Sequence, residues 1–275
     1  MIKKTVGVWL GLCVFWFTPG ASMAADAPRR IVSFNLCTDQ LLLALADPEQ
    51  IAGLSPYAVN PAMSVMTAAA APYRKLDWDA ESVVNLAPDL VLTAPSHRPI
   101  RAMLASMGVR VAEIPFIVDI EAAKRQAREV GVLVGHPERG EALAREIEQS
   151  ERKLASTSRA RTALLVGRGG YTEGATSLPS AMLRAAGFSS PTIAPKGLGG
   201  FVSLEQLLID GPDVLVTQDV PRDAQDQGAL YITHPAVIAR YADRRINLPA
   251  RYTLCGGPAL LEGLKYLGDA VQALR

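Results

Sequence analysis

Two stretches of this chain share one pattern: ESVVNLAPDLVLT at residues 81–93 and EQLLIDGPDVLVT at residues 205–217. Each begins with a glutamate, Glu81 or Glu205, in the first turn of a short predicted helix. A Pro-Asp pair follows seven residues later, and an apolar strand that ends in threonine comes directly after it. Equal spacing predicts the same helix–turn–strand unit twice, with the two glutamates at equivalent places.

Short apolar strands alternate with helical patterns around both units. The predicted strands are 30–34, 51–54, 89–93, 109–113, 162–166, 213–217 and 245–248. Thr38 or Asp39 is placed to cap the helix that follows the first strand. Because strands that alternate with helices favour parallel sheets, the sequence predicts an α/β fold with two Rossmann-like lobes.

The middle of the chain has a different character. Residues 120–134 follow a helical pattern that Gly135-His136-Pro137 interrupts, and residues 138–156 are strongly helix-forming and rich in charge. Such a pattern favours a long, rigid backbone helix between the lobes rather than a flexible linker. We therefore expect an N-terminal lobe at 25–119, connecting helices at 120–158 and a C-terminal lobe at 159–275.

The N-terminus is typical of a secretory signal peptide. Lys3 and Lys4 precede an apolar run at 6–17, and small residues stand at Ser22 and Ala24. The run falls well short of the roughly 20 residues that span a bilayer. We expect residues 1–24 to be removed after Ala24, which places the mature chain in the periplasm of a Gram-negative cell.

Composition and motifs exclude several classes of protein. The chain carries 28 basic and 27 acidic residues, and removal of the leader takes Lys3 and Lys4, so the mature chain has no basic excess for nucleic acid. No Gly-x-Ser-x-Gly elbow or phosphate-binding P-loop is present. The glycines at 167–170 lack the third glycine of a dinucleotide site. The sequence therefore favours a binding protein over an enzyme.

Two cysteines, Cys37 and Cys255, remain in the predicted mature chain. An oxidising compartment permits a disulfide between them. Two buried thiols, or two thiols that face a shared cleft, fit the sequence equally well. The pairing stays open at this point.

The mature chain resembles the helical-backbone class of periplasmic binding proteins over nearly its whole length. That class supplies the ferrichrome-, haem- and cobalamin-binding components of ABC importers. Besides both Glu…Pro-Asp units and the mid-chain helix, the resemblance rests on Arg30-Ile31-Val32-Ser33, Ile51-Ala52-Gly53-Leu54-Ser55, Met107-Gly108-Val109-Arg110-Val111 and Gly169-Gly170-Tyr171-Thr172. It implies two lobes that flank a ligand cleft, with a long helix that joins them.

The resemblance also implies partners. An acid on each lobe of such proteins pairs with arginines of the permease, and the matching positions here are Glu81 and Glu205. We expect a monomer that docks on an ABC permease dimer in the inner membrane. A chelate chaperone or sensor without a permease is a further alternative.

Ligand contacts are expected on the loops that follow the strands, because crevices at the carboxyl ends of parallel strands bind ligands. The candidates of the first lobe are Asn35, Cys37, Tyr57, His97 and Arg98, with Ser96 beside them. The candidates of the second lobe are Arg168, Tyr171, Tyr252 and Cys255, with Gln218 beside Thr217. Guanidinium groups suit anionic oxygens, and aromatic rings suit broad ligand faces.

The expected cargo is an iron chelate, with a ferric siderophore as the first choice and haem or cobalamin as alternatives. Only three histidines are present, and His136 and His234 each precede a proline, which indicates structural roles. A bare transition-metal site needs three or four converging donors, so none is expected, and no resident cofactor either. Cobalamin-binding relatives carry a tryptophan six residues before each acid, where this chain has Lys75 and Gly199.

Overall fold

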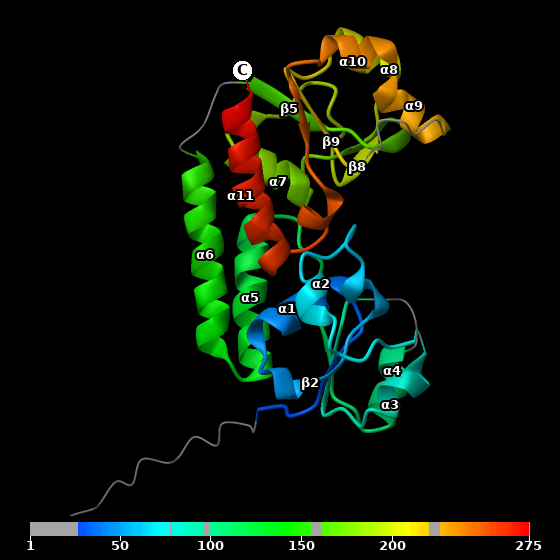
Figure 1. The fold of residues 1–275 in the computed structure, drawn as a ribbon, viewed down its shortest axis with the longest axis vertical. Coiled ribbons are helices and arrows are strands. Elements are labelled where there is room, and N and C mark those ends of the chain that lie inside the picture. The colour runs from blue at the N-terminus through cyan, green and yellow to red at the C-terminus, as the bar shows by residue number, and fades with distance from the viewer. Residues whose placement is uncertain (1–26, 78, 96–99, 156–160, 220–225, 275) are drawn as a thin grey trace, which may run out of the picture.

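The computed structural model describes residues 27–77, 79–95, 100–155, 161–219 and 226–274. Two four-stranded sheets form the centres of two lobes, stacked along the long axis of the molecule (Figure 1). The first sheet has the order β2-β1-β3-β4 and the second the order β10-β9-β5-β7. All their pairings are parallel. The predicted two-lobed α/β fold is confirmed.

The strands are short, and several are shorter than predicted. Those of the first lobe are β1 (Ile31–Ser33), β2 (Ile51–Gly53), β3 (Leu90–Thr93) and β4 (Val111–Glu113). Those of the second sheet are β5 (Arg161–Leu165), β7 (Phe188–Ser189), β9 (Val214–Thr217) and β10 (Arg245–Asn247). A separate antiparallel pair, β6 (Tyr171–Glu173) with β8 (Gly199–Phe201), was absent from the sequence prediction.

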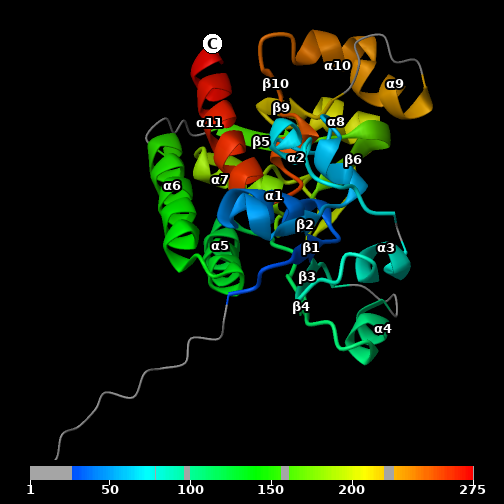
Figure 2. The same ribbon diagram turned by 60° about the horizontal axis from the view of Figure 1, so that its bottom comes forward.

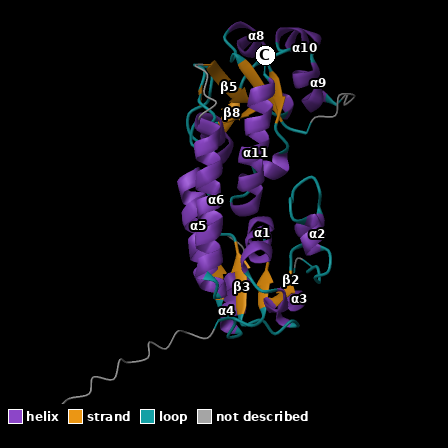
Figure 3. Ribbon diagram, turned by 60° about the vertical axis from the view of Figure 1, so that its left-hand side comes forward, coloured by secondary structure: helices purple, strands orange, loops and turns teal. Residues whose placement is uncertain are grey.

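Helices cover both sheets and the outer side of the molecule (Figure 3). The α-helices are α1 (Leu36–Leu45), α2 (Thr67–Ala70), α3 (Ala80–Val84), α4 (Ile100–Ser106), α5 (Ile120–Val134), α6 (Pro137–Ala155), α7 (Leu178–Ala185), α8 (Leu204–Ile209), α9 (Gln227–Thr233), α10 (Pro235–Arg240) and α11 (Gly257–Ala273). Short 3-10 turns are η1 (Pro48–Gln50), η2 (Pro56–Val59), η3 (Arg168–Gly170) and η4 (Ala250–Tyr252). No helix within the described ranges is long and apolar enough to cross a membrane.

The repeat that opened the sequence forms equivalent units in the two lobes. Helix α3 leads into β3 and α8 leads into β9, and each of these strands lies in the interior of its sheet. The aspartate of each Pro-Asp pair binds the start of the neighbouring strand. Asp89 accepts the backbone N–H groups of Arg29 and Arg30 at 2.6 and 3.1 Å, and Asp213 accepts that of Thr162 at 2.7 Å. The aspartates thus fix the register of equivalent strand pairs.

Alternate strand residues face two different cores. Leu90 and Leu92 of β3 pack into a large core with α1, α5, α6, α7 and α11, while Val91 packs against α3 and α4. In β9, Val214 and Val216 enter the same large core, and Leu215 faces α8 and α10. The large core therefore runs without interruption from one lobe to the other. Figure 2 shows the strands of the first lobe with α1 and α5 on one side and α3 and α4 on the other.

The connecting helices form an antiparallel hairpin, of which α6 runs from the first lobe to the second (Figure 1). The turn is Gly135, whose φ of 87° favours glycine, so the predicted interruption is confirmed. A Cβ on Gly131 would lie 2.9 Å from Gly140 Cα, so two glycines let α5 and α6 approach closely. Helix α6 is about 28 Å long, and α11 packs along it. The predicted domain boundary at 158 lies outside the described residues.

The start of α1 differs from the prediction. Asn35, not Thr38 or Asp39, is the N-cap: its backbone is extended, and its side chain accepts the N–H of Cys37 at 2.9 Å. Thr38 and Asp39 lie inside the first turn and are buried. The helix begins earlier than predicted because the strand before it is short, so the capping position moves to the first polar residue after β1.

The buried Asp39 carboxylate binds the loop that follows β2 through hydrogen bonds. Its carboxylate accepts the backbone N–H of Ser55 at 3.1 Å and the Ser55 hydroxyl at 2.5 Å. Burial raises the pKa of Asp39 to about 7, against the opposing effects of hydrogen bonds from Ser33 and Ser55 and of the Lys75 charge. Ser55 is the N-cap residue of η2, so this buried acid anchors the turn that carries Tyr57.

Asp39→Asn should flatten the pH dependence of stability. The folded protein binds a proton at Asp39 more tightly than the unfolded chain does, so between an ordinary pKa of 3.8 and about 7 the folded state holds more protons. Wild-type stability should fall as pH rises through this window, by at most about 4 kcal/mol. Urea unfolding of both proteins across this pH range measures the difference.

Asp213→Asn is the matched control for this experiment. Hydrogen bonds from the backbone N–H and the hydroxyl of Thr162 lower the pKa of Asp213, so this group stays ionised throughout the upper part of the window in both states. Its removal should leave the slope of stability against pH unchanged between pH 5 and 7. Equal slopes for wild type and Asp39→Asn would refute the buried-acid assignment.

Asp89→Ala and Asp213→Ala should destabilise the protein by similar amounts, about 1–2 kcal/mol each, because each removes a carboxylate that accepts backbone N–H groups. The exposed Asp243 is the control, and Asp243→Ala should cost less than about 0.5 kcal/mol. Chemical denaturation of the three variants gives these values. A loss at only one of the paired positions would contradict their equivalence.

Candidate functional site

The loops at the carboxyl ends of the two sheets meet between the lobes. We call these loops the interlobe face; its described residues are 54–66, 94–95, 114–119, 166–174, 199–201, 218–219 and 248–256. Arg251 donates a hydrogen bond across it to the Pro61 carbonyl at 3.4 Å. Figures 1 and 3 show the α2 segment reaching from the first lobe toward the second. Parallel strands place all their carboxyl ends at one edge, so both lobes offer their loops to the same space.

The two cysteines of the predicted mature chain form a disulfide between the lobes. Cys37 lies in the first turn of α1, and Cys255 comes two residues before α11. Their Cα atoms are 5.1 Å apart, although 218 positions separate them in sequence. The pairing that the sequence left open is therefore a bond. With both sulfurs in the bond, neither offers a thiolate to a soft metal ion.

The first lobe brings one predicted aromatic residue to the interlobe face. Tyr57 is exposed on η2. It lies two residues after the N-cap residue Ser55, whose hydroxyl donates a hydrogen bond to Asp39. Asn35 is half-buried, and its side-chain oxygen is engaged in capping α1. Ser96, His97 and Arg98, which follow β3 by three to five residues, lie outside the described residues.

The second lobe places Arg168 and Tyr171 at the two ends of the η3 turn. Arg168 of η3 forms an ion pair with Asp226 at 2.5 Å, and this contact holds the pKa of Asp226 below its usual value. Tyr171 packs edge-to-face against Phe201, with ring centroids 5.6 Å apart. Gly170 allows the tight turn between them: its φ is 80°, and a Cβ there would lie 2.5 Å from the Val202 carbonyl oxygen.

Tyr252 and its neighbour Arg251 complete the second lobe's contribution. The Arg251 guanidinium lies 5.0 Å from the centroid of the Tyr252 ring and donates to the Tyr252 hydroxyl at 3.3 Å. Tyr252 also packs against Tyr266 of α11, with centroids 5.2 Å apart. Gln218 donates to Thr253 at 2.6 Å and so supports the same turn. Arg251 is therefore oriented by an aromatic platform while it contacts the first lobe.

Three residues of this face were missed by the sequence analysis. Phe116 and Phe201 are 68% and 76% exposed, and Arg251 makes the interlobe hydrogen bond. Phe116 follows β4 and could have been found by the same rule that found Tyr57. Phe201 belongs to the β6–β8 pair, for which the sequence carries no hairpin signal. Together with Tyr57 and Tyr171, these rings give the face exposed aromatic surface, which is typical of ligand and partner sites.

Glu81 and Glu205 occupy equivalent places on the outside of the lobes. Each is exposed in the first turn of its helix, after the N-cap residues Asp79 and Ser203 respectively. Backbone and Ser203 hydrogen bonds lower the pKa of Glu205. Helices α3 and α8 lie in different lobes, well apart along the long axis (Figure 1). The two carboxylates therefore form a widely spaced pair, one on each lobe.

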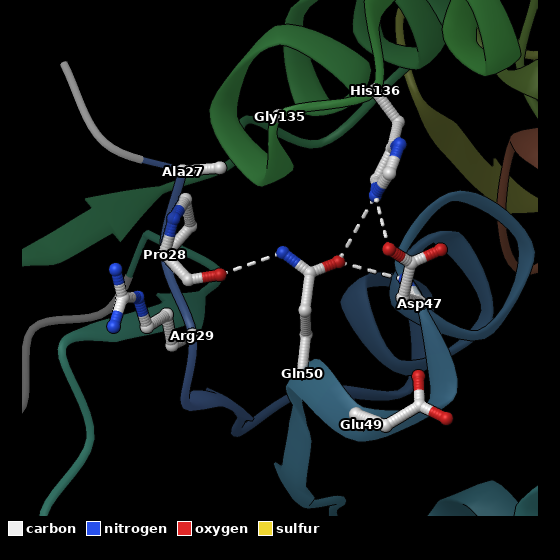
Figure 4. A pocket seen from close by; sticks show the side chains of 8 residues that line it. All are labelled: Ala27, Pro28, Arg29, Asp47, Glu49, Gln50, Gly135 and His136. Carbon is white, nitrogen blue, oxygen red and sulfur yellow. Dashed lines mark hydrogen bonds and ion pairs between the residues drawn. The ribbon is translucent and has the colours of Figure 1, made fainter.

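Two hollows lie elsewhere in the molecule, away from the interlobe face. One of about 410 Å³ lies beside η1, where the Gln50 side chain bridges the Pro28 carbonyl, the Asp47 N–H and His136 (Figure 4). Asp47, Gln50 and His136 bind one another there, in agreement with the structural role expected of His136. Another, of about 600 Å³, lies in the second lobe between Thr217, Tyr241 and Arg245. Within the described part of the chain, no group of three or more His, Cys, Asp or Glu residues is arranged to hold a metal ion.

Solved structures with the same fold include a possible iron-binding protein, a haem-binding protein and a vitamin B12-binding protein. A possible iron-binding, periplasmic solute-binding protein from Staphylococcus epidermidis has a TM-score of 0.72 and 19% identity, with 90% of this chain and 99% of that chain covered. The haem-binding protein RhuT from Roseiflexus has a TM-score of 0.71 and 22% identity, with coverage of 90% and 99%. The vitamin B12-binding protein BtuF of Vibrio cholerae has a TM-score of 0.67 and 16% identity, with coverage of 90% and 97%. These identities establish the fold alone.

Family membership rests on the sequence itself. No curated protein matches the chain. The sequence pattern of the family described as periplasmic binding protein matches residues 31–229, which is well over half of the chain. This match includes both Glu…Pro-Asp units, both connecting helices and the loops after β1, β2 and β5. The chain therefore belongs to the periplasmic binding protein family.

Proposed function

We propose that this binding protein captures a metal chelate, with a ferric siderophore as the first candidate, and delivers it to an ABC importer. The observation that carries the proposal is the interlobe face, where the loops of two parallel sheets meet and expose aromatic rings beside arginines. Membership of a family of binding proteins also means that the chain is not an enzyme. The predicted signal peptide supports residence in the periplasm, and we propose a Gram-negative one.

The proposed grip on the chelate combines aromatic and cationic contacts. Tyr57 from the first lobe and Tyr171 from the second expose their rings on separate loops. Tyr252, which is half-buried beside Arg251 and Tyr266, is the third proposed aromatic contact. Arg168 is held by Asp226, so an anionic chelate would compete with that carboxylate for the guanidinium. Carboxylate, catecholate and hydroxamate oxygens all suit this geometry. Asn35, His97 and Arg98 remain proposed contacts of the first lobe, and the Cys37–Cys255 pair would contribute as a disulfide.

Haem or cobalamin is the second candidate, and the exposed rings favour it. A flat macrocycle buries its faces against aromatic side chains, and Phe116 and Phe201 offer more such surface than a compact hydroxamate chelate requires. Haem iron also accepts a tyrosine phenolate as an axial ligand, which Tyr57 or Tyr171 would supply. Trp78 is the only tryptophan after residue 24, so the paired tryptophans of cobalamin-binding relatives are missing.

Delivery requires a docking surface, for which we propose Glu81 and Glu205. Their equivalence follows from the repeated helix–turn–strand unit, in which Asp89 and Asp213 make equivalent contacts. Two exposed carboxylates on equivalent surfaces suit a permease dimer that offers two equivalent basic sites. A protein that stored or sensed the chelate without a permease would have no use for this pair.

Titration of the mature protein should reveal binding of at least one chelate with a Kd below about 1 μM. Ferric hydroxamate, ferric catecholate, ferric citrate, haem and cyanocobalamin form a suitable panel, followed by quenching of Trp78 and tyrosine fluorescence. Tyr171→Ala should weaken that binding at least about tenfold, which corresponds to the loss of one aromatic contact. Ile238→Ala, which removes an exposed side chain from α10 outside the interlobe face, should leave the affinity unchanged. Failure of the whole panel to bind would contradict the proposed cargo class.

Glu81→Ala combined with Glu205→Ala should abolish delivery while chelate affinity stays within about twofold of wild type, because the pair lies outside the interlobe face. Uptake of the radiolabelled iron chelate into cells that produce each variant is the measurement. The control variant carries Glu129→Ala and Glu146→Ala, two exposed acids on α5 and α6. Normal uptake by the double variant of Glu81 and Glu205 would exclude the docking role and favour the chaperone or sensor.

A further inference from the structure

Covalent bonds join the two lobes at two separate places. The first is the backbone, which leaves the first lobe through α5 and returns along α6 toward β5. The second is the Cys37–Cys255 disulfide, which joins the first turn of α1 to the residue pair before α11. One covalent joint leaves two rigid bodies free to rotate about three axes. Two joints leave rotation about the single line that connects them.

The surroundings of the disulfide bring the lobes into close contact. Gly257 has a φ of 59°, and a Cβ there would lie 2.7 Å from Leu41 of α1. A Cβ on Gly256 would lie 2.8 Å from Ile117, in the loop after β4. Leu36, Cys255 and Ala259 form a small buried cluster with Met63 beside it. The start of α11 is therefore seated directly against the first lobe.

Arg251 also joins the two sides of the interlobe face. Arg251 reaches the Pro61 carbonyl through an exposed hydrogen bond of 3.4 Å. Such a bond opens readily, because water competes for both groups. Arg251 lies only four positions from Cys255, so the disulfide keeps this hydrogen bond and the η2 loop in register. Breaking the disulfide removes a covalent constraint on the distance between η2 and η4.

We propose that the Cys37–Cys255 disulfide is a covalent strap that pre-sets the arrangement of the two lobes before any ligand arrives. The strap confines lobe motion to small rocking about the line between the disulfide and the α6 connection. It keeps the loops that carry Tyr57 and Tyr252 at a fixed separation. It also sets the spacing of Glu81 and Glu205, a consequence that rests on the proposed docking function.

Pre-setting has a direct thermodynamic effect on binding. When only part of a population has the binding-competent arrangement, the apparent Kd rises in inverse proportion to that part. A strap that keeps the competent arrangement populated therefore tightens binding without adding a contact to the ligand. Reduction reverses this effect: a dithiol breaks the Sγ–Sγ bond, each cysteine gains one hydrogen, and the reductant becomes its own disulfide.

Hydrogen exchange of the ligand-free protein tests the strap. The oxidised wild type is compared with a variant that carries Cys37→Ser and Cys255→Ser. Backbone amides in 56–66 and 250–257, such as those of Asn60 and Leu254, should exchange at least about tenfold faster in the variant. Amides in β3 and β9, inside the two sheets, should exchange at unchanged rates, because each lobe keeps its own fold.

Wild-type protein reduced with dithiothreitol is the second arm, and it keeps the test valid where the serine pair fails to fold. Reduced wild type should match the serine variant, and dithiothreitol should change nothing in that variant. Equal exchange of the loop amides in oxidised and reduced protein would overturn the proposal. Faster exchange of loops and sheet interiors together would also overturn it, since the disulfide would then act on global stability alone. The measurement needs no chelate and no permease, so its outcome is independent of the proposed cargo and docking partner.

Discussion

The direction of parallel strands is the constraint on which the rest of this structure depends. Every strand of a parallel sheet ends at the same edge, so each lobe has one edge where all its functional loops begin. Helix α6 and the packing of α11 against α1 hold these two edges facing each other. The Cys37–Cys255 disulfide joins the two lobes near the same place. Tyr57, Tyr171 and Tyr252 lie on loops of these edges that are far apart in sequence, and we propose that they contact one ligand. The site is a property of the arrangement of two sheets rather than of any local motif.

The lobes are held as one body by a shared core as well as by the disulfide. The largest apolar cluster takes residues from β1 and β3 of one lobe, from β5 and β9 of the other, and from the helices between them. Wide separation of the lobes would expose this apolar surface to water and would therefore cost free energy. Small rotations of one lobe against the other keep the surface buried. The α5–α6 hairpin, closed by facing glycines, stiffens the same connection.

The sequence predicted the features that repeat or follow local rules. The two Glu…Pro-Asp units, the interruption at Gly135 and the long helix up to Ala155 all appear as expected, because helix periodicity and proline or glycine breaks are local signals. The disulfide could not be predicted, since 218 positions separate its cysteines and only the packing of α11 on α1 brings them together. The β6–β8 pair, and with it Phe201, was missed because its two strands are joined by α7 and β7. Asn35 capped α1 because β1 ended sooner than its apolar run indicated.

The location of the metal in the loaded protein tests the central claim most directly. Crystals of the mature protein with its bound chelate, measured at the absorption edge of the metal, give that location without reference to any assumed contact. The account predicts one anomalous peak in the interlobe face, among the loops that carry Tyr57, Tyr171 and Tyr252. A peak in either hollow away from that face, beside His136 or beside Arg245, would contradict it.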